Sequence, residues 1–296
     1  MIDWIELLKK LMKNKLNNLK NNLNNKIWYE KKYQIEPYLF EERGNFKGMS
    51  KLLLKPRNTK EVSEVLKICF QNKIPLVPQG GRTSLSGGTI PNPKKNEVIL
   101  SMEKMNKILS VDKDNFSLTA QAGCTLNNVK KFSQDNNMYF PLNLPSKESC
   151  TIGGNIASNA GGSNVLKYGM TRDLVLGLEI VLPDGRILNN LKEIKKDNRG
   201  YDLKHLFIGS EGSLGIITTA VLKLFPKPKK TGMAIVAIKN IKKVIEFLKY
   251  INSGYKEQLQ SFELNSNLGM SFIKKHFTDI IIPFNNSYPW YVIFEL

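Results

Sequence analysis

The sequence predicts an α+β fold, and three patterns lead to this prediction. From residue 50 onward, short apolar runs typical of strands alternate with segments whose apolar residues recur at helical spacing. Residues 173–188 alternate apolar positions about a Pro-Asp-Gly turn, which indicates a β-hairpin. After a linker rich in proline and lysine at 226–230, a second strand–helix–strand pattern begins. A chain of 296 residues is long enough for one large domain or two of ordinary size.

The first segment, from Ile2 to Leu23, predicts a basic amphipathic helix, followed by a polar hinge at Asn24 and Asn25. Lysines and asparagines fill the positions between its apolar residues. Such a helix has two roles open to it: it can lie on a membrane surface, or it can cover its own domain, which is the commoner arrangement. The apolar residues at helical spacing are Ile5, Leu8, Met12, Leu16, Leu19 and Leu23.

Residues 52–136 predict alternating strands and helices. Asn58 or Thr59 is suited to cap a helix that runs to about Phe70, because a short polar side chain can accept a hydrogen bond from the first helical turn. The next strand, at 74–78, delivers a glycine-rich run at its carboxyl end, which is typical of ligand loops in α/β folds. The remaining elements predicted here are strands at 52–56, 97–101 and 117–123 and a helix at 125–136.

The C-terminal part of the chain predicts further strands around one helix. A long strand at 215–228 is followed by strands at 233–238 and 259–264 with a helix at 240–251 between them. The last run, Tyr291 to Leu296, is apolar and has no helix after it. We expect this strand to present an unpaired edge, and such an edge favours association with other chains.

The chain is strongly basic, with 44 lysines and arginines against 26 aspartates and glutamates, a formal net charge of +18. These charges are spread over the whole sequence, and no recognition helix or aromatic RNA-binding motif accompanies them, so we expect no nucleic-acid partner. Two histidines far apart predict no metal site. Three cysteines without C-x-x-C spacing fit a reduced compartment. The predicted location is cytoplasmic, with peripheral contact at the inner membrane face as the alternative.

Three glycine-rich runs, at residues 78–88, 150–162 and 209–218, are the most informative feature of the sequence. Paired glycines lack Cβ atoms, so the backbone can take positive φ and bring its N–H groups against a ligand. Closely spaced N–H groups form a concavity that suits a pyrophosphate. The sequence has no G-x-G-x-x-G and no glycine followed by lysine, which excludes the Rossmann and Walker A fingerprints. Ordinary turns explain any single pair, but three runs in one domain-sized region favour a ligand.

Together these runs resemble the FAD-linked oxidases with the fold of p-cresol methylhydroxylase and vanillyl-alcohol oxidase, and most of all the D-2-hydroxyacid dehydrogenases. The resemblance covers roughly Tyr38 to the C-terminus. The P-x-G-G-x-T-x-L motif of this family stands at 78–85, and its G-G-x-x-A-x-N-A-G-G motif stands at 153–162. Tyr168-Gly169 follows, and 201–218 matches the segment that closes over the flavin.

The resemblance implies a two-lobed FAD-binding domain followed by the beginning of an α/β cap domain. It places the N-terminal helix and hinge at 1–36, the FAD-binding domain at 37–228 and an incomplete substrate or cap domain at 229–296.

The implied cofactor is FAD, held noncovalently. The backbone around Gly80, Gly81 and Thr83 would bind the pyrophosphate as a neutral cradle, without a cation. Some relatives link the flavin covalently to a histidine in the first run, where this sequence has Gln79 and Arg82. The residues that the resemblance assigns to the cofactor are Pro78, Gln79, Gly80, Gly81, Arg82, Thr83, Ser84, Leu85, Ser146, Gly153, Gly154, Ala157, Asn159, Ala160, Gly161, Tyr168, Gly212, Gly215, Ile216 and Ile217.

The implied reaction is transfer of a hydride from the Cα of a small 2-hydroxyacid to flavin N5. The resemblance also implies that part of the substrate site is missing, so it assigns no catalytic residue and no metal ligand. His205 falls in a structural segment of the family pattern and is not expected to replace them. Two alternatives stay open: a flavin-binding subunit that is inactive until a second polypeptide supplies the cap, and a basic interaction protein whose glycine loops are relics.

Overall fold

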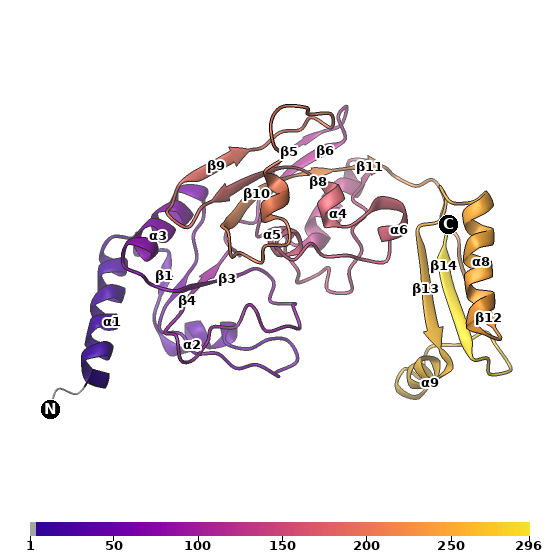
Figure 1. The fold of residues 1–296 in the computed structure, drawn as a ribbon, viewed down its shortest axis with the longest axis horizontal. Helices are drawn as coiled ribbons and strands as arrows, with labels where there is room; N and C mark the ends of the chain where they lie inside the picture. The colour runs from indigo at the N-terminus through magenta and orange to yellow at the C-terminus, as the bar shows by residue number, and fades with distance from the viewer. Residues whose placement is uncertain (1–3) are drawn as a thin grey trace. The chain divides into compact units, whose positions relative to one another are not determined.

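The computed structural model describes residues 4–296, which divide into two compact units. Unit 1 holds the described residues up to Phe140 together with Pro145–Ala160 and Leu174–Pro226. Unit 2 holds Pro141–Leu144, Gly161–Asp173 and Lys227–Leu296. Both units mix helices and strands (Figure 1), which confirms the predicted α+β class. The domain limits at residues 36 and 228 stay predictions, and the structure adds that two short inner segments cluster with the C-terminal part.

A four-stranded sheet forms the first half of unit 1. The elements of this half are α1 (Trp4–Asn21), β1 (Trp28–Tyr29), α2 (Lys32–Ile35), the 3-10 helix η1 (Glu36–Tyr38), β2 (Leu53–Leu54), α3 (Thr59–Gln71), β3 (Leu76–Gln79) and β4 (Val98–Ser101). The strand order is β1-β2-β4-β3, in which β2, β4 and β3 are parallel. Leu53 and Ile99 are fully buried and pack with Tyr38, so the centre of this sheet is a hydrophobic core.

The helix α3 begins where the sequence predicts. The side chain of Asn58 accepts a hydrogen bond from the Glu61 N–H at 3.0 Å, so Asn58 rather than Thr59 is the N-cap. A cap of this kind stabilises a helix by about 1 kcal/mol. Glu61 lies in the first turn, where the positive end of the helix dipole favours a carboxylate.

The described part of the N-terminal helix packs on its own unit. Leu16, Leu19 and Leu23 are buried, and Asn18 donates a hydrogen bond from Nδ2 to Asn72 Oδ1 at 3.1 Å, at the end of α3. These contacts support the packing role, while contact with a membrane surface stays a prediction. Ile2 lies outside the described residues. Across residues 4–296, no helix combines the length and the apolar character that crossing a membrane requires.

A five-stranded antiparallel sheet forms the second half of unit 1, so that this unit has the two lobes that the sequence predicts. The elements are β5 (Ile108–Asp112), β6 (Ser117–Gln121), α4 (Leu126–Asp135), β7 (Met138–Tyr139), α5 (Ile152–Ala157), β8 (Val175–Val181), β9 (Ile187–Asn190), α7 (Lys204–Phe207), β10 (Ile216–Lys223) and β11 (Phe225–Pro226). The order is β5-β6-β10-β8-β9, and β7 pairs with β11 separately. The predicted hairpin is confirmed, since β8 pairs antiparallel with β9 around the Pro-Asp-Gly turn. The edge strand β5 is not foreseen in the sequence.

Unit 2 is a three-stranded sheet with helices. Its elements are α6 (Val165–Tyr168), the 3-10 helix η2 (Thr171–Leu174), whose last residue belongs to unit 1, β12 (Met233–Ile238), α8 (Ile241–Gly254), β13 (Ser261–Ser266), α9 (Asn267–His276) and β14 (Trp290–Glu295). Helix α8 covers one face, where Phe247 lies 5.9 Å from Phe262 and 5.5 Å from Phe294 between ring centres. Val292 and Ile238 belong to the same core cluster.

The expected unpaired edge at the last strand is wrong. The strand order is β12-β14-β13, so β14 lies in the middle and pairs antiparallel on both sides over its whole length. The apolar run from Trp290 to Phe294 is therefore explained by burial, because a middle strand hydrogen-bonds to neighbours on both sides and packs its apolar face on a helix. The predicted association through this edge loses its physical basis.

Candidate site at three glycine runs

The first glycine run leaves the carboxyl end of β3, and its conformation is fixed by packing. A Cβ on Gly80 would overlap Thr151 Oγ1, and one on Gly81 would overlap the Ser149 carbonyl oxygen. Both glycines thus allow the first run to lie directly on the start of the second. Gln79 is 1% exposed, and its Nε2 donates to the main-chain oxygens of Tyr38 at 2.9 Å and Thr89 at 2.7 Å. Its side chain therefore anchors both ends of the loop.

The main chain of this loop offers donors that the protein does not use. The N–H groups of Gly80, Gly81, Arg82 and Thr83 make no hydrogen bond to any other residue of 4–296. Backbone N–H groups are obligatory donors, and nearly all of them find a partner when they are shielded from water. Four such donors in succession, on a half-buried loop, are available to bind an anion.

The second glycine run is largely a short helix and not an extended loop. Helix α5 starts at Ile152, and the Thr151 hydroxyl caps it by accepting from the Gly154 N–H at 3.4 Å. A Cβ on Gly153 would lie 2.6 Å from Ala122 Cβ, so this glycine lets α5 pack closely on the end of β6. Gly154 is exposed, and only Thr151 Oγ1, at 3.2 Å, approaches the position of its Cβ. Gly153 therefore faces the protein, and Gly154 faces open space.

The third glycine run closes on the other two. A Cβ on Gly212, whose φ is +79°, would lie 2.6 Å from Pro78 Cγ, in the first run. The Glu211 N–H donates to the Ala157 carbonyl at 2.8 Å, in the second run. Three segments that are more than 45 residues apart in sequence thus meet at one place in unit 1, which ordinary turns have no reason to do.

The predicted reason for the paired glycines needs correction. We expect positive φ at the paired glycines, and Gly87 of the 87–88 pair has it at 76°, but none of the pairs at 80–81, 153–154 and 161–162 does. Positive φ also occurs at the single glycine Gly212 and at three residues other than glycine: Arg82 at 57°, Asn159 at 47° and Glu211 at 52°. Gly80, Gly81 and Gly153 are needed for close approach between segments, because a Cβ at any of them would overlap a neighbouring segment.

The structure brings together most of the predicted cofactor residues, although not all in one unit. Ile216 and Ile217 are buried at the start of β10, and the Ser146 carbonyl accepts from the Cys150 N–H at 2.8 Å, ahead of the second run. Gly161 and Tyr168 belong to unit 2. The predicted residues in unit 1 are Pro78, Gln79, Gly80, Gly81, Arg82, Thr83, Ser84, Leu85, Ser146, Gly153, Gly154, Ala157, Asn159, Ala160, Gly212, Gly215, Ile216 and Ile217.

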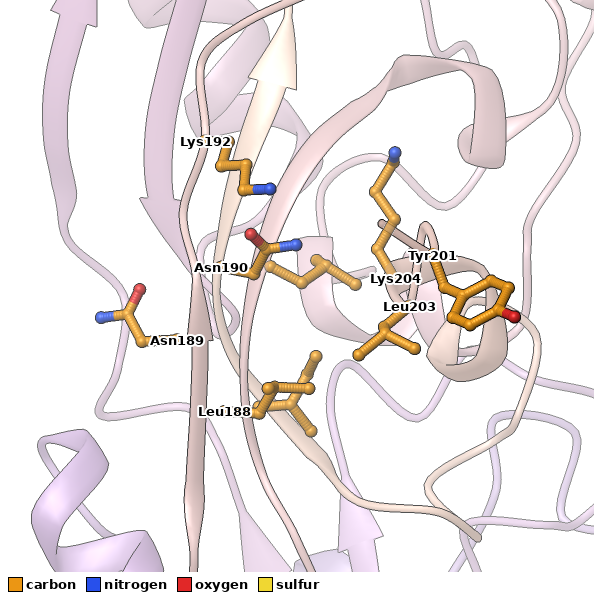
Figure 2. Close-up of a pocket in the computed structure, with 9 residues that line it drawn as sticks. Leu188, Asn189, Asn190, Lys192, Tyr201, Leu203 and Lys204 are labelled. Carbon is orange, nitrogen blue, oxygen red and sulfur yellow. The ribbon is translucent and has the colours of Figure 1, made fainter. Parts of the chain in front are cut away.

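A pocket of about 200 Å³ adjoins the third run and was not foreseen in the sequence. Ile180 lines it, and the Cγ2 of this residue is 2.8 Å from the position of a Cβ on Gly215. Asn190 and Lys192 extend toward the side of Leu203 and Lys204, whereas Asn189 points away (Figure 2). Most of the aliphatic lining comes from β8 and β9, and the polar residues come from the end of β9, the loop after it and α7, so only the folded sheet brings them together. The lining residues are Leu178, Ile180, Leu188, Asn189, Asn190, Lys192, Tyr201, Leu203 and Lys204.

Other reactive side chains do not form a competing site in the described part of the chain. All three cysteines are free and buried, and burial raises the pKa of Cys69 to about 12 and of Cys124 to about 11. A thiol with such a pKa stays protonated and is a poor nucleophile. His205 is exposed, with Nε2 at 3.3 Å from Asp202. No group of three metal-ligating residues occurs within residues 4–296.

The glycine site fits the pyrophosphate of a dinucleotide. Four unbonded N–H groups supply donors, and a positively charged guanidinium, that of Arg82, lies in the same loop. The exposed Gly154 leaves space that a Cβ would fill. Backbone N–H groups aimed at one place are a common way in which proteins hold phosphates.

Comparison with known proteins agrees with this reading. Residues 50–190 match the family described as FAD binding domain. D-2-hydroxyglutarate dehydrogenase of Arabidopsis thaliana is 40% identical over 90% of this chain and 47% of its own length. A D-lactate dehydrogenase of Schizosaccharomyces pombe, named as putative, is 37% identical over 88% of this chain and 49% of its own length. The chain thus spans about half the length of these relatives.

Among solved structures, p-cresol methylhydroxylase superposes with a TM-score of 0.75, over 97% of this chain and 61% of that one. At 19% identity this likeness speaks for the fold alone. Fold, glycine site and family match all lead to the same assignment. Residues 50–190 match the FAD binding domain, the chain has the fold of p-cresol methylhydroxylase, and it is similar to the D-2-hydroxyglutarate and D-lactate dehydrogenases.

Proposed function

We propose that this chain is the FAD-binding part of a dehydrogenase of small D-2-hydroxyacids, and that it holds FAD noncovalently. The observation that carries the proposal is the meeting of three glycine runs around unbonded N–H groups in unit 1. The names of the relatives support the substrate class, since they act on D-2-hydroxyglutarate or D-lactate. Turnover, substrate and partners of the whole protein belong to this proposal.

The residues of the chain would bind and orient the cofactor. The N–H groups of residues 80–83 would donate to the pyrophosphate, and the exposed surface of Gly154 would let the cofactor lie close to α5. FAD, when bound, supplies hydride acceptance, which no protein side chain provides. Gln79, Ser84, Leu85, Asn159, Ala160, Gly161 and Tyr168 are proposed contacts on the family pattern only.

Noncovalent binding predicts that all flavin leaves the protein on denaturation. Some relatives carry a histidine that links the flavin covalently at one of two positions in this run. Here Gln79 is buried, and its amide hydrogen-bonds to main-chain carbonyls. Arg82 carries a guanidinium that stays protonated and is therefore no nucleophile for a covalent link. Acid precipitation of the purified yellow chain should therefore leave the whole absorbance near 450 nm in the supernatant. Flavin that stays in the washed pellet would contradict the prediction.

Reduction by substrate tests the dehydrogenase part of the proposal. The flavin-loaded chain is mixed anaerobically with D-2-hydroxyglutarate or D-lactate, with the L-enantiomers as controls, and the flavin absorbance is followed. Bleaching by the D-forms alone supports a chain with a working substrate site. Flavin that dithionite reduces but neither D-acid does favours the second candidate, a flavin-binding subunit that needs a second polypeptide. A chain that binds no FAD would overturn both and favour an interaction protein with relic loops.

A further inference from the structure

Arg82 stands out within the first glycine run. Its φ of 57° is unusual for a residue with a long side chain. Its guanidinium carbon lies 4.5 Å from the centre of the Tyr38 ring, which is the geometry of a cation–π contact. Among residues 10–296, whose side chains the structure describes, no carboxylate forms an ion pair with it. A strained loop residue thus carries an unneutralised positive charge in the same loop as four unbonded N–H groups.

Tyr38 is held firmly from several sides. It is 8% exposed, its hydroxyl donates to Glu103 Oε2 at 2.6 Å, and its carbonyl accepts from Gln79 Nε2. Lys55 also lies over this ring, at 4.7 Å, but Glu103 neutralises it at 2.9 Å. The Lys55–Glu103 pair therefore balances its own charge, and Arg82 contributes the excess positive charge of this cluster.

The ionisation of the cluster agrees with this arrangement. Burial raises the pKa of the Tyr38 phenol, and the hydrogen bond to Glu103 raises it further, so the phenol stays protonated and donates. Burial alone would raise the pKa of the Glu103 carboxyl, but the bonds from Lys55 and Tyr38 outweigh burial and lower it. The carboxylate is thus charged at neutral pH and occupied by two donors.

We propose that Arg82 is a phosphate-binding residue whose guanidinium neutralises the pyrophosphate of FAD, and that Tyr38 is the positioning residue that holds it there through its ring. The cradle is then not neutral, as the sequence suggested, but cationic. The inference rests on the proposed FAD binding. It predicts that this charge contributes to a preference of the chain for FAD over riboflavin, which has the same ring system without phosphates.

The test compares Arg82→Asn with the wild-type full-length chain. Asparagine tolerates positive φ better than most residues, so the loop conformation should persist while the charge is lost. In fluorescence titrations of the flavin-free protein, the Kd for FAD should rise about 10- to 100-fold, as expected for the loss of hydrogen bonds to charged groups. Affinity for riboflavin should stay within about twofold. Arg186→Asn removes the same charge from the exposed β8–β9 turn and should change neither Kd.

Salt dependence gives a second measurement that needs FAD alone. Between about 0.05 and 0.5 M NaCl, wild-type affinity for FAD should fall more steeply than that of Arg82→Asn, because salt screens a half-exposed ion pair. Equal Kd values and equal salt slopes in the two proteins would overturn the inference while leaving the proposed function intact. Absence of FAD binding by the wild type would overturn both.

The Tyr38 variants separate positioning from a general structural role. Tyr38→Phe keeps the ring and loses only the bond to Glu103, so it should bind FAD as the wild type does. Tyr38→Leu removes the ring and should weaken FAD binding several-fold while riboflavin binding is kept. If Tyr38→Leu loses affinity for both flavins equally, or Tyr38→Phe is as weak as Tyr38→Leu, Tyr38 does not act through Arg82.

Discussion

Gly154→Val should abolish FAD binding without lowering the stability of the flavin-free chain. The glycine is exposed, has no positive φ, and only Thr151 Oγ1 approaches the position of its Cβ. Valine is no worse than glycine as a helix former, so α5 should remain intact. A branched side chain would nevertheless fill the space that the cofactor needs. We expect at least a 100-fold rise in the Kd for FAD, about 2.7 kcal/mol or more, and an unchanged thermal midpoint for the apoprotein.

Two further glycine variants serve as comparisons, one expected to be destabilised and one expected to be neutral. Gly81→Val places its side chain on the Ser149 carbonyl, so it should lose stability as well as flavin. Gly254→Val, at the end of α8, meets no atom within 4 Å and should leave both flavin binding and stability unchanged. Wild-type affinity for FAD in Gly154→Val would show that the cofactor does not lie against the exposed side of α5.

Val292→Asp should unfold the sheet of unit 2. Val292 is fully buried in β14, between β12 and β13 and within the core cluster that Val244 of α8 joins. A carboxylate there would have no charge partner and would be taken out of water, which costs several kcal/mol. We expect a loss of about 4 kcal/mol or more in the free energy of unfolding, measured by urea denaturation followed through tryptophan fluorescence.

The neighbouring residue of the same strand is the matched control. Ile293 points to the opposite face of the sheet and is half-buried, so Ile293→Asp should cost clearly less, about 1–2 kcal/mol. Equal losses at both positions would mean that the two faces of β14 do not differ as the structure has them. A negligible loss at Val292 would restore the exposed strand that the sequence alone suggested.

Local patterns were enough to predict most elements of the fold. Asn58 caps α3 as its residue type allows, and the Pro-Asp-Gly turn joins β8 to β9. These features depend on residues close in sequence, where propensity and turn chemistry act directly. The helix inside the second glycine run was not predicted, because two adjacent glycines disfavour a helix that here is stabilised by packing on β6 and β10.

In the candidate site too, some features could be predicted from the sequence and others depend on the folded structure. The three glycine runs could be recognised from their composition and order, and the cofactor followed from their resemblance to a family. Their physical role could not be read from the sequence, since it depends on which backbones touch. Gly81 lies on Ser149 and Gly212 on Pro78 through contacts that span 68 and 134 residues of chain.

Hydrophobic pattern and motif order predict the fold class, the cofactor family and most of the longer strands and helices of this chain, although not β5 or α9. Tertiary structure alone decides that β14 lies in the middle of its sheet, because strand order depends on non-local pairing and not on position in the sequence. It also places the Arg82 guanidinium over Tyr38, 44 residues earlier in the chain. That contact forms only when η1 and the loop after β3 are packed on one sheet, so it cannot be predicted from any local sequence pattern.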